Sequence, residues 1–221
     1  MKGPGVFGTY IERPYEPEVS GALVNLIQPG WICVDIGAHV GYFTLLLYFT
    51  LLLAHLVGEG GHVFAFEALP ENARWLRENV AINGFTARVT VENMAVTDGQ
   101  TPTVRLHAPP HYTTEWSIVR PSSDRRSVEI RATCLDEYFA HRPKVDFIKM
   151  DVEGAEYLAL QGGHTVLYRD RPLCLIELHG EEGQRAAQFL MELRYQMEDL
   201  RGSPSIGLPF PRYILARAKA A

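Results

Sequence analysis

The sequence contains little cysteine and no cysteine spacing that would suggest a zinc site or a disulfide framework. Its three cysteines, Cys33, Cys134 and Cys174, are scattered over 221 residues. Cys33 and Cys174 fall inside apolar runs that predict core strands, so we expect buried free thiols. The N-terminus also lacks a signal-peptide pattern, and a cytoplasmic location is the corresponding prediction.

An excess of positive charge is also absent. The net charge is −5, so the overall electrostatics do not favour a nucleic-acid partner. A local basic patch remains open, because four arginines lie close together in the sequence: Arg120, Arg125, Arg126 and Arg131.

A long apolar run is the third missing feature. The nearly uncharged stretch from Tyr42 to Val57 is short for a membrane span and contains His55. It predicts a helix buried against a sheet, and no membrane partner is expected. The hydrophobic content of 47% and charged content of 21% are typical of a globular protein.

The order of apolar runs and helical patterns predicts an α/β fold with a parallel sheet. Strands are expected at 31–36, 62–67, 89–96, 145–151, 172–179 and 212–217. Helices are expected at 19–27, 42–57, 71–83, 135–140, 157–162 and 184–193. We predict a single domain over residues 1–221, with an N-terminal arm and helix in 1–28.

Residues 97–135 interrupt this alternation. Strands are expected at 103–107 and 127–133, and 116–119 is a candidate third strand. Between them lies an aromatic-rich loop. The segment is either an exposed hairpin-like insertion or a substrate lid.

A six-residue sequence occurs twice in direct succession. Tyr42–Leu47 and Tyr48–Leu53 are identical, as Tyr-Phe-Thr-Leu-Leu-Leu. The duplication either lengthens the predicted helix or is looped out locally. Because it directly follows a glycine turn, it could also disturb a ligand bound there.

This glycine turn follows the first predicted strand, as Asp35-Ile36-Gly37-Ala38-His39-Val40-Gly41. A strand that turns through glycines into a helix is typical of a site for the polar part of a ligand. Asp35 argues against a phosphate, which its carboxylate would repel. The two glycines do not form G-x-G-x-x-G, and no lysine or arginine accompanies them, so a dinucleotide or triphosphate site is not predicted.

Polar residues follow every predicted parallel strand, and the carboxyl ends of such strands lie along one edge of the sheet. In chain order they are Asp35, Glu67, Asn93 with Met94, Asp151 with Glu153, and Glu177 with His179. This set suits a nucleoside with a cationic, amino-acid-like tail. Glu67 would accept the ribose hydroxyls, and Glu16 or Glu18 would reach the ammonium group. S-adenosylmethionine fits this description.

Several motifs together resemble the FkbM family of S-adenosylmethionine-dependent methyltransferases. They span residues 34–44, 64–68, 135–138 and 147–156, and the opening residues 15–18 also match. The resemblance covers roughly residues 10 to 180. It implies the Rossmann-like class I methyltransferase fold, with seven mostly parallel strands in the order 3-2-1-4-5-7-6. It also implies O-methylation of a hydroxyl on a sugar or natural-product small molecule.

The resemblance places the methionine and ribose portions of the cofactor at the glycine turn and at Glu67. It places the adenine along residues 93–95. The complete predicted cofactor set is Glu18, Asp35, Gly37, Ala38, His39, Gly41, Glu67, Ala68, Asn93, Met94, Ala95 and Asp151.

Methyl transfer to an alcohol also needs a group that takes the hydroxyl proton. Asp151 is the first choice and His179 the second, because its ordinary pKa is nearest neutrality. Lys149 either keeps Asp151 ionised or is only an ion-pair partner. Glu153 and Glu156 are either catalytic or simply favourable charges at a helix N-terminus.

A divalent cation such as magnesium is a further option. Asp151, Glu153, Glu177 and His179 offer suitable ligands, but they lack a diagnostic spacing, so no metal site is predicted. Methylation of an RNA ribose or a protein side chain is the alternative within the enzyme class. A non-catalytic S-adenosylmethionine-binding protein is the third interpretation.

Overall fold

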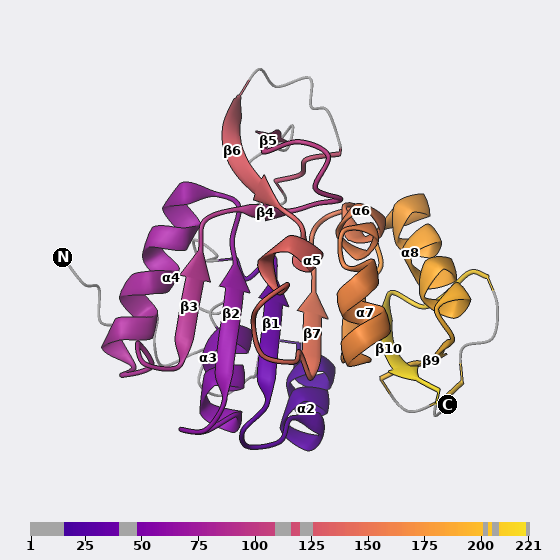
Figure 1. The fold of residues 1–221 in the computed structure, drawn as a ribbon, viewed down its shortest axis with the longest axis horizontal. Coiled ribbons are helices and arrows are strands. Elements are labelled where there is room, and N and C mark those ends of the chain that lie inside the picture. The colour runs from indigo at the N-terminus through magenta and orange to yellow at the C-terminus, as the bar shows by residue number, and fades with distance from the viewer. Residues whose placement is uncertain are drawn as a thin grey trace.

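The computed structural model describes residues 16–39, 48–108, 116–119, 126–200, 203–204 and 208–219. Gly41, the first copy of the hexapeptide and the arm expected over residues 1–14 lie outside these ranges. The chain forms a large sheet and, beyond one end of its strands, a small one (Figure 1).

The large sheet has seven strands in the order β3-β2-β1-β7-β8-β10-β9. Their bounds are β1 Ile32–Ile36, β2 His62–Phe66, β3 Val89–Glu92, β7 Phe147–Met150, β8 Leu173–Glu177, β9 Tyr195–Glu198 and β10 Tyr213–Ala218. Strands β3, β2, β1, β7 and β8 pair in parallel, and β10 is antiparallel to both of its neighbours. Numbered within this sheet alone, the order is 3-2-1-4-5-7-6, so the predicted class I fold is confirmed.

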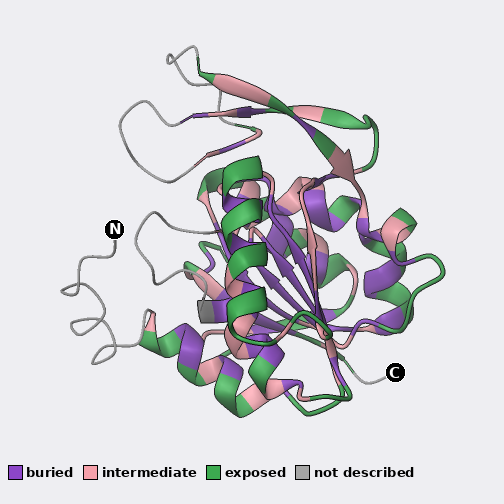
Figure 2. Cartoon of the chain, turned by 90° about the vertical axis from the view of Figure 1, so that its left-hand side faces the viewer, coloured by how far each residue is buried: buried purple, intermediate pink, exposed green. Residues whose placement is uncertain are grey.

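Helices cover both faces of this sheet, which explains why its central strands are continuously apolar. One face packs against α2 Pro17–Leu26, α3 Tyr48–Leu56 and α4 Pro70–Ile82. The other packs against α5 Leu135–Tyr138, α6 Glu156–Gln161, α7 His164–Asp170 and α8 Gly180–Glu192. Figure 2 shows the buried strands between the helices.

Side chains of β1 alternate between these two layers. Cys33 belongs to the core on the α3 side, whereas Val34 and Ile36 belong to the core on the α6 side. Asp35 therefore points toward α3. Both Cys33 and Cys174 are buried free thiols, as the sequence predicted.

The small sheet has the order β4-β6-β5 and lies beyond the carboxyl ends of the parallel strands (Figure 1). Its strands are β4 Ala95–Val96, β5 Thr103–His107 and β6 Ser127–Thr133. The strands predicted at 103–107 and 127–133 are confirmed. The candidate strand at 116–119 is wrong, because only Ser117 forms an isolated bridge, with His107.

Other boundaries also differ from the prediction. The strand expected over 89–96 divides at Asn93, so that β3 joins the large sheet and β4 the small one. Sequence patterns missed α7 and β9, which are short. The predicted helix over 42–57 is described only from Tyr48, within the second copy of the hexapeptide.

Within the described residues, no helix combines the length and apolarity that crossing a membrane would require.

Candidate active site

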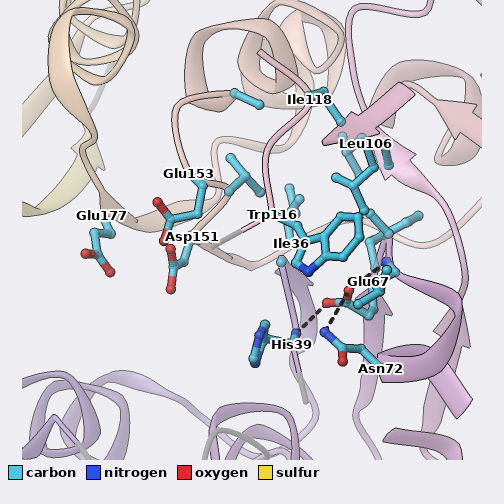
Figure 3. A pocket seen from close by; sticks show the side chains of 18 of the residues that line it. Ile36, His39, Glu67, Asn72, Leu106, Trp116, Ile118, Asp151, Glu153 and Glu177 are labelled. Carbon is cyan, nitrogen blue, oxygen red and sulfur yellow. Dashed lines mark hydrogen bonds between the residues drawn. The ribbon is translucent and has the colours of Figure 1, made fainter. Parts of the chain in front are cut away.

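A cavity of about 220 Å³ lies between the carboxyl ends of the parallel strands and the small sheet (Figure 3). Strand ends and the turns after them contribute Ile36, Gly37, His39, Phe66, Glu67, Ala68, Asp151, Val152, Glu153 and Glu177. The small sheet and its connections contribute Met94, Ala95, Val96, Leu106, Trp116 and Ile118. The remaining lining residues are Glu16, Leu69, Asn72, Ala155 and Arg212.

The glycine turn is held tightly against the next strands. Gly37 has a φ of 76°, and a Cβ added there would lie 1.8 Å from the main-chain oxygen of Asp151. Only glycine fits this position. The amides of Gly37 and Ala38 both donate to the carbonyl of Phe66, at 3.0 Å each. These amides are therefore paired within the protein, whereas the sequence suggested that they would face a ligand.

Asp35 is fully buried below the cavity and does not line it. Its Oδ2 accepts a hydrogen bond of 2.6 Å from the Thr50 hydroxyl, and its Oδ1 lies 3.3 Å from Lys149 Nζ. Lys149 Nζ also donates to the carbonyl of Gly37 at 3.3 Å. Asp35 thus supports the turn through an ion pair, which differs from the expected direct contact with the cofactor.

Lys149 is buried with Asp35. Burial acts to lower the pKa of the Lys149 ammonium, but the carboxylates of Asp35 and Asp151 outweigh it and raise that pKa. Lys149 is therefore a permanent cation under the glycine turn. It is not among the cavity-lining residues, and its position suits the ion-pair role that the sequence left open.

Glu67 is held in place by donors from its own chain (Figure 3). Its Oε2 accepts from the His39 amide at 2.7 Å, and its Oε1 accepts from the Leu69 amide at 2.8 Å and from Asn72 Nδ2 at 3.4 Å. Burial raises the pKa of Glu67 to about 7, although these donors act in the opposite direction. A carboxylate has about four acceptor positions, so capacity remains for a ligand hydroxyl.

Of residues 93–95, Asn93 stabilises a turn, whereas Met94 and Ala95 line the cavity. Asn93 Nδ2 donates to the carbonyls of Glu67 and Ala68, at 2.9 and 2.8 Å. Its amide therefore shapes the turn after β2 and does not line the cavity. Met94, Ala95 and Ala68 do line it.

The turn after β7 carries Asp151 and Glu153 into the opposite end of the cavity (Figure 3). Glu153 and Gly154 have φ values of 52° and 98°, so the chain reverses sharply here. The Asp151 side chain is 33% exposed. Burial raises the pKa of Asp151 to about 7, Lys149 lowers it, and the carboxylate of Glu177 raises it further.

His179 is placed beside four carboxylates. Its Nδ1 lies 2.7 Å from Oε1 of the fully buried Glu156. Its Nε2 lies 3.3 Å from Glu177 Oε1, 3.6 Å from Glu153 Oε2 and 4.0 Å from Asp151 Oδ1. Burial acts to lower the pKa of His179, but the hydrogen bonds that its ring donates to the carboxylates of Glu156 and Glu177 outweigh it and raise the pKa to about 10. His179 is therefore an imidazolium near neutral pH and has no free base nitrogen.

Glu177 is also fixed by charged side chains at this end of the cavity. Arg212 Nε donates to Glu177 Oε1 at 2.5 Å, and Arg212 Nη2 also contacts this oxygen. Burial alone would raise the pKa of Glu177, but the hydrogen bonds from His179 and Arg212 outweigh it and lower that pKa. Glu177 is thus a carboxylate held between two cations.

Glu16, and not Glu18, lines the cavity. Glu16 is the N-cap residue of α2, with a φ of 42°, and its Oε1 accepts a 2.8 Å hydrogen bond from the Tyr213 hydroxyl. Glu18 is exposed on α2 and is not among the residues that line the cavity. Pro17 was the overlooked signal, because proline favours the first helical position and makes the preceding residue the cap.

Asp151, Glu177 and His179 are the described residues that could hold a metal ion, since each offers a ligand atom within 4.8 Å of the others. The donor set fits a cation poorly. Arg212 already contacts Glu177 Oε1, and His179 must lose a proton that its neighbours hold firmly. Glu177 is thus already paired with two cationic side chains.

Sequence reasoning missed several lining residues. Arg212 precedes β10, and its proximity to Glu177 follows from the antiparallel register that pairs Tyr213 with Glu177. Leu106 and Ile118 come from the segment between β4 and β6, where no motif marks them. Gly41 belongs to the residues that the structure leaves undescribed.

Comparison with known proteins identifies similar chains. Residues 35–199 match the family model described as the methyltransferase FkbM domain. A protein-L-isoaspartate O-methyltransferase from Aeropyrum pernix is 39% identical over 97 residues, which are 43% of this chain and 34% of that protein. The chain thus spans about a third of the length of this curated relative.

Two solved structures share the fold. The crystal structure of methyltransferase FkbM from Methylobacillus flagellatus KT has a TM-score of 0.56 and 18% identity, over 87% of this chain and 45% of that one. Fibrillarin from Aeropyrum pernix, solved with natively bound S-adenosyl-L-methionine, has a TM-score of 0.52 and 12% identity, over 90% and 73%. At these identities the similarity shows the fold alone.

Proposed function

Because the chain belongs to the FkbM methyltransferase family, we propose that it transfers a methyl group from S-adenosylmethionine to a hydroxyl of a small molecule. The acceptor class that we propose is a sugar or natural-product alcohol. The observation that carries the proposal is the cavity at the carboxyl edge of the parallel strands, with Glu67 at one end and Asp151 at the other.

The nucleoside of the cofactor would occupy the Glu67 end. The Glu67 carboxylate is fixed by three donors and has acceptor capacity for the ribose hydroxyls. Met94 and Ala95 line the same part of the cavity and would pack along the adenine. The methionine portion would then extend past Gly37 toward Asp151, where Glu16 can accept a hydrogen bond from its ammonium group.

The acceptor hydroxyl would lie beside Asp151. In the reaction the hydroxyl oxygen attacks the methyl carbon, the carbon–sulfur bond breaks, and its electron pair remains on sulfur as the thioether product. Asp151 takes the hydroxyl proton, because its raised pKa places its titration near neutrality. Positioning of the two reactants supplies much of the remaining rate enhancement.

His179 would act as a positioning residue. Both of its ring nitrogens face carboxylates, so it is unsuited to be the base that the sequence offered as second choice. It instead holds Glu156 below the turn and Glu177 beside Asp151. The Asp151 carboxylate is thereby kept in a fixed electrostatic environment.

The charges around Asp151 favour a neutral acceptor over an anionic one. Glu16, Glu153 and Glu177 also line this end, and Arg212 is already paired with Glu177. The nearby carboxylates would repel a phosphate or carboxylate group on the acceptor. RNA is therefore the less suitable acceptor, and sugar hydroxyls can donate hydrogen bonds to these carboxylates.

The experiment is transfer of a labelled methyl group from S-adenosylmethionine to a panel of acceptors. The panel contains free and natural-product-linked sugars, polyketide-type alcohols, RNA oligonucleotides and a peptide with an isoaspartate. We expect a methyl ether on a sugar or natural-product alcohol, identified by mass spectrometry. Transfer only to RNA or to the peptide would contradict the proposed acceptor, and cofactor binding without transfer to any of them would favour the non-catalytic alternative.

A further inference from the structure

The cavity has an apolar cover that the proposed reaction does not yet use. Leu106, Trp116 and Ile118 line it from the side of the small sheet. In Figure 3 the Trp116 ring lies between Ile36 and Glu67, while Asp151, Glu153 and Glu177 lie on the other side. The ring therefore belongs to the Glu67 end.

Packing places Trp116 next to the same end. It packs against the cluster of Ala95, Leu106 and Ile130, and Ala68 and Leu69 pack against this cluster too. Ala68 and Leu69 directly follow Glu67, and Ala95 lies where the adenine is expected. Trp116 is half-buried, so part of its ring surface remains available to a ligand in the cavity.

We propose that Trp116 packs its indole on the nucleoside of the cofactor and is a cofactor-binding residue. This inference rests on the proposed function and adds a contact that the motifs of the parallel sheet do not include. It also gives the segment between β5 and β6 a role in cofactor binding, because Trp116 lies over the cofactor end of the cavity. Stacking of a base on an aromatic ring is tolerant of exact chemistry and suits adenine.

Ser117 fixes this cover to the turn after β7. It is only 3% exposed, and its Oγ donates to the main-chain oxygen of Glu153 at 2.9 Å. Its amide donates to the His107 carbonyl at 3.1 Å, and the His107 amide donates back to the Ser117 carbonyl at 2.9 Å. Trp116 is thus linked both to β5 and to the turn that carries Asp151 and Glu153.

This link makes Ser117 a positioning residue. Glu153 and Gly154 adopt positive φ values, and the Ser117 hydroxyl satisfies the carbonyl of Glu153 within this reversed turn. A nucleoside packed under Trp116 would therefore be held by the same unit that carries the proposed base.

Tryptophan fluorescence can test the contact directly, because the chain has three tryptophans and only Trp116 lines the cavity among those that the structure describes. S-adenosylhomocysteine would be titrated into the wild type, Trp116→Phe and Trp75→Phe, with affinity measured in parallel by calorimetry. Trp75 is 43% exposed on α4 and is the matched control.

We expect saturating S-adenosylhomocysteine to change the emission of the wild type and of Trp75→Phe, and Trp116→Phe to lose this change. Trp116→Ala should bind about ten- to a hundredfold more weakly. An undiminished emission change in Trp116→Phe would overturn the inference, as would wild-type affinity in Trp116→Ala. Should Trp116→Ala fail to fold, the Phe variant still decides.

The Ser117→Ala variant tests the link. At saturating S-adenosylhomocysteine, folded Ser117→Ala should show a smaller emission change than the wild type, and an equal change would refute the positioning role. The failure of the proposed function is distinguishable. In that case the wild type itself shows no calorimetric binding. Failure of the Trp116 inference instead requires a wild type that binds, together with wild-type affinity in Trp116→Ala or an undiminished emission change in Trp116→Phe.

Discussion

The two ends of the cavity hold their carboxylates by different means. Glu67 is fixed largely by main-chain amides, those of His39 and Leu69. At the other end, Glu177 is fixed by the charged side chains of His179 and Arg212, and Glu156 by His179 together with the main-chain amide of Gly154. The main-chain arrangement follows from the strand-turn geometry, whereas the side-chain arrangement depends on residues brought together by the tertiary fold.

This difference assigns different tasks to the two ends. A carboxylate with fixed donors and spare acceptor capacity suits recognition of an unreactive group such as a ribose. The pKa of Asp151, like that of Glu67, is raised to about 7, but Asp151 is 33% exposed at the end where the acceptor is proposed to bind, and this position suits it to proton transfer. Substitutions at the two ends should therefore separate binding from catalysis.

The largest expected effect is on turnover. Asp151→Asn removes the proposed base and should lower kcat by about a hundred- to ten-thousandfold, which is typical of lost general base catalysis. Calorimetry should show little change in cofactor affinity, since the ribose contact is at Glu67. A kcat near that of the wild type would show that another group takes the proton.

The second effect is on stability. His179→Gln leaves Glu156 and Glu177 without their shared cation and should lower the free energy of unfolding by about 3 kcal/mol at neutral pH. Denaturant unfolding measures this change. His55→Gln, at an exposed position on α3, is the matched control and should leave the stability unchanged.

The pH dependence of the stability of the wild type and of His179→Gln is a further test. The pKa of His179 is raised from 6.5 to about 10 in the folded protein. Its contribution is therefore complete below pH 6.5 and is lost as pH rises toward 10, because the unfolded chain releases the proton first. The wild type should lose stability over this range more steeply than His179→Gln, and parallel curves would contradict the assigned imidazolium.

A smaller effect is expected below the glycine turn. Thr50→Val removes the hydroxyl that donates to Asp35 and should cost about 1–2 kcal/mol of stability. Thr44→Val is the control, because it makes the same change in the identical first copy of the hexapeptide and should cost much less. A loss that appears only when both threonines are replaced would show that either copy can donate to Asp35.

The smallest effect should come from metal ions. Since Arg212 and His179 already pair with Glu177, addition of magnesium or of EDTA should leave cofactor affinity and turnover unchanged. A magnesium-dependent rate would show that a cation binds at Asp151, Glu177 and His179 and displaces the His179 proton.

The sequence predicted the fold and the parts of the site that depend on strand ends. Gly37 and Glu67 lie in the cavity because β1 and β2 pair in parallel, with Ile36 opposite Phe66. Arg212 was missed because its contact with Glu177 arises from an antiparallel strand far along the chain. The orientation of Asp35 could not be predicted, because an acid at a strand end can point to either face, and here it faces Thr50 and Lys149.

The hexapeptide repeat shows another limit of sequence reasoning. Two identical copies give identical patterns, so nothing local indicates which threonine contacts Asp35. In the folded protein, the Thr50 hydroxyl donates to Asp35. The position of Trp116 was also beyond local patterns. The aromatic content of its loop was evident in the sequence, but the bridge between Ser117 and His107 that orients Trp116 was not.

The most direct test of the account is calorimetric titration of S-adenosylmethionine, with NAD as the control ligand, into the wild type and Glu67→Gln. We predict that the wild type binds S-adenosylmethionine and not NAD. Glu67→Gln should bind about ten- to a hundredfold more weakly, because charge-assisted hydrogen bonds from the ribose are lost. Equal affinity in the two proteins, or no binding by a folded wild type, would contradict the assignment of this cavity as the cofactor site.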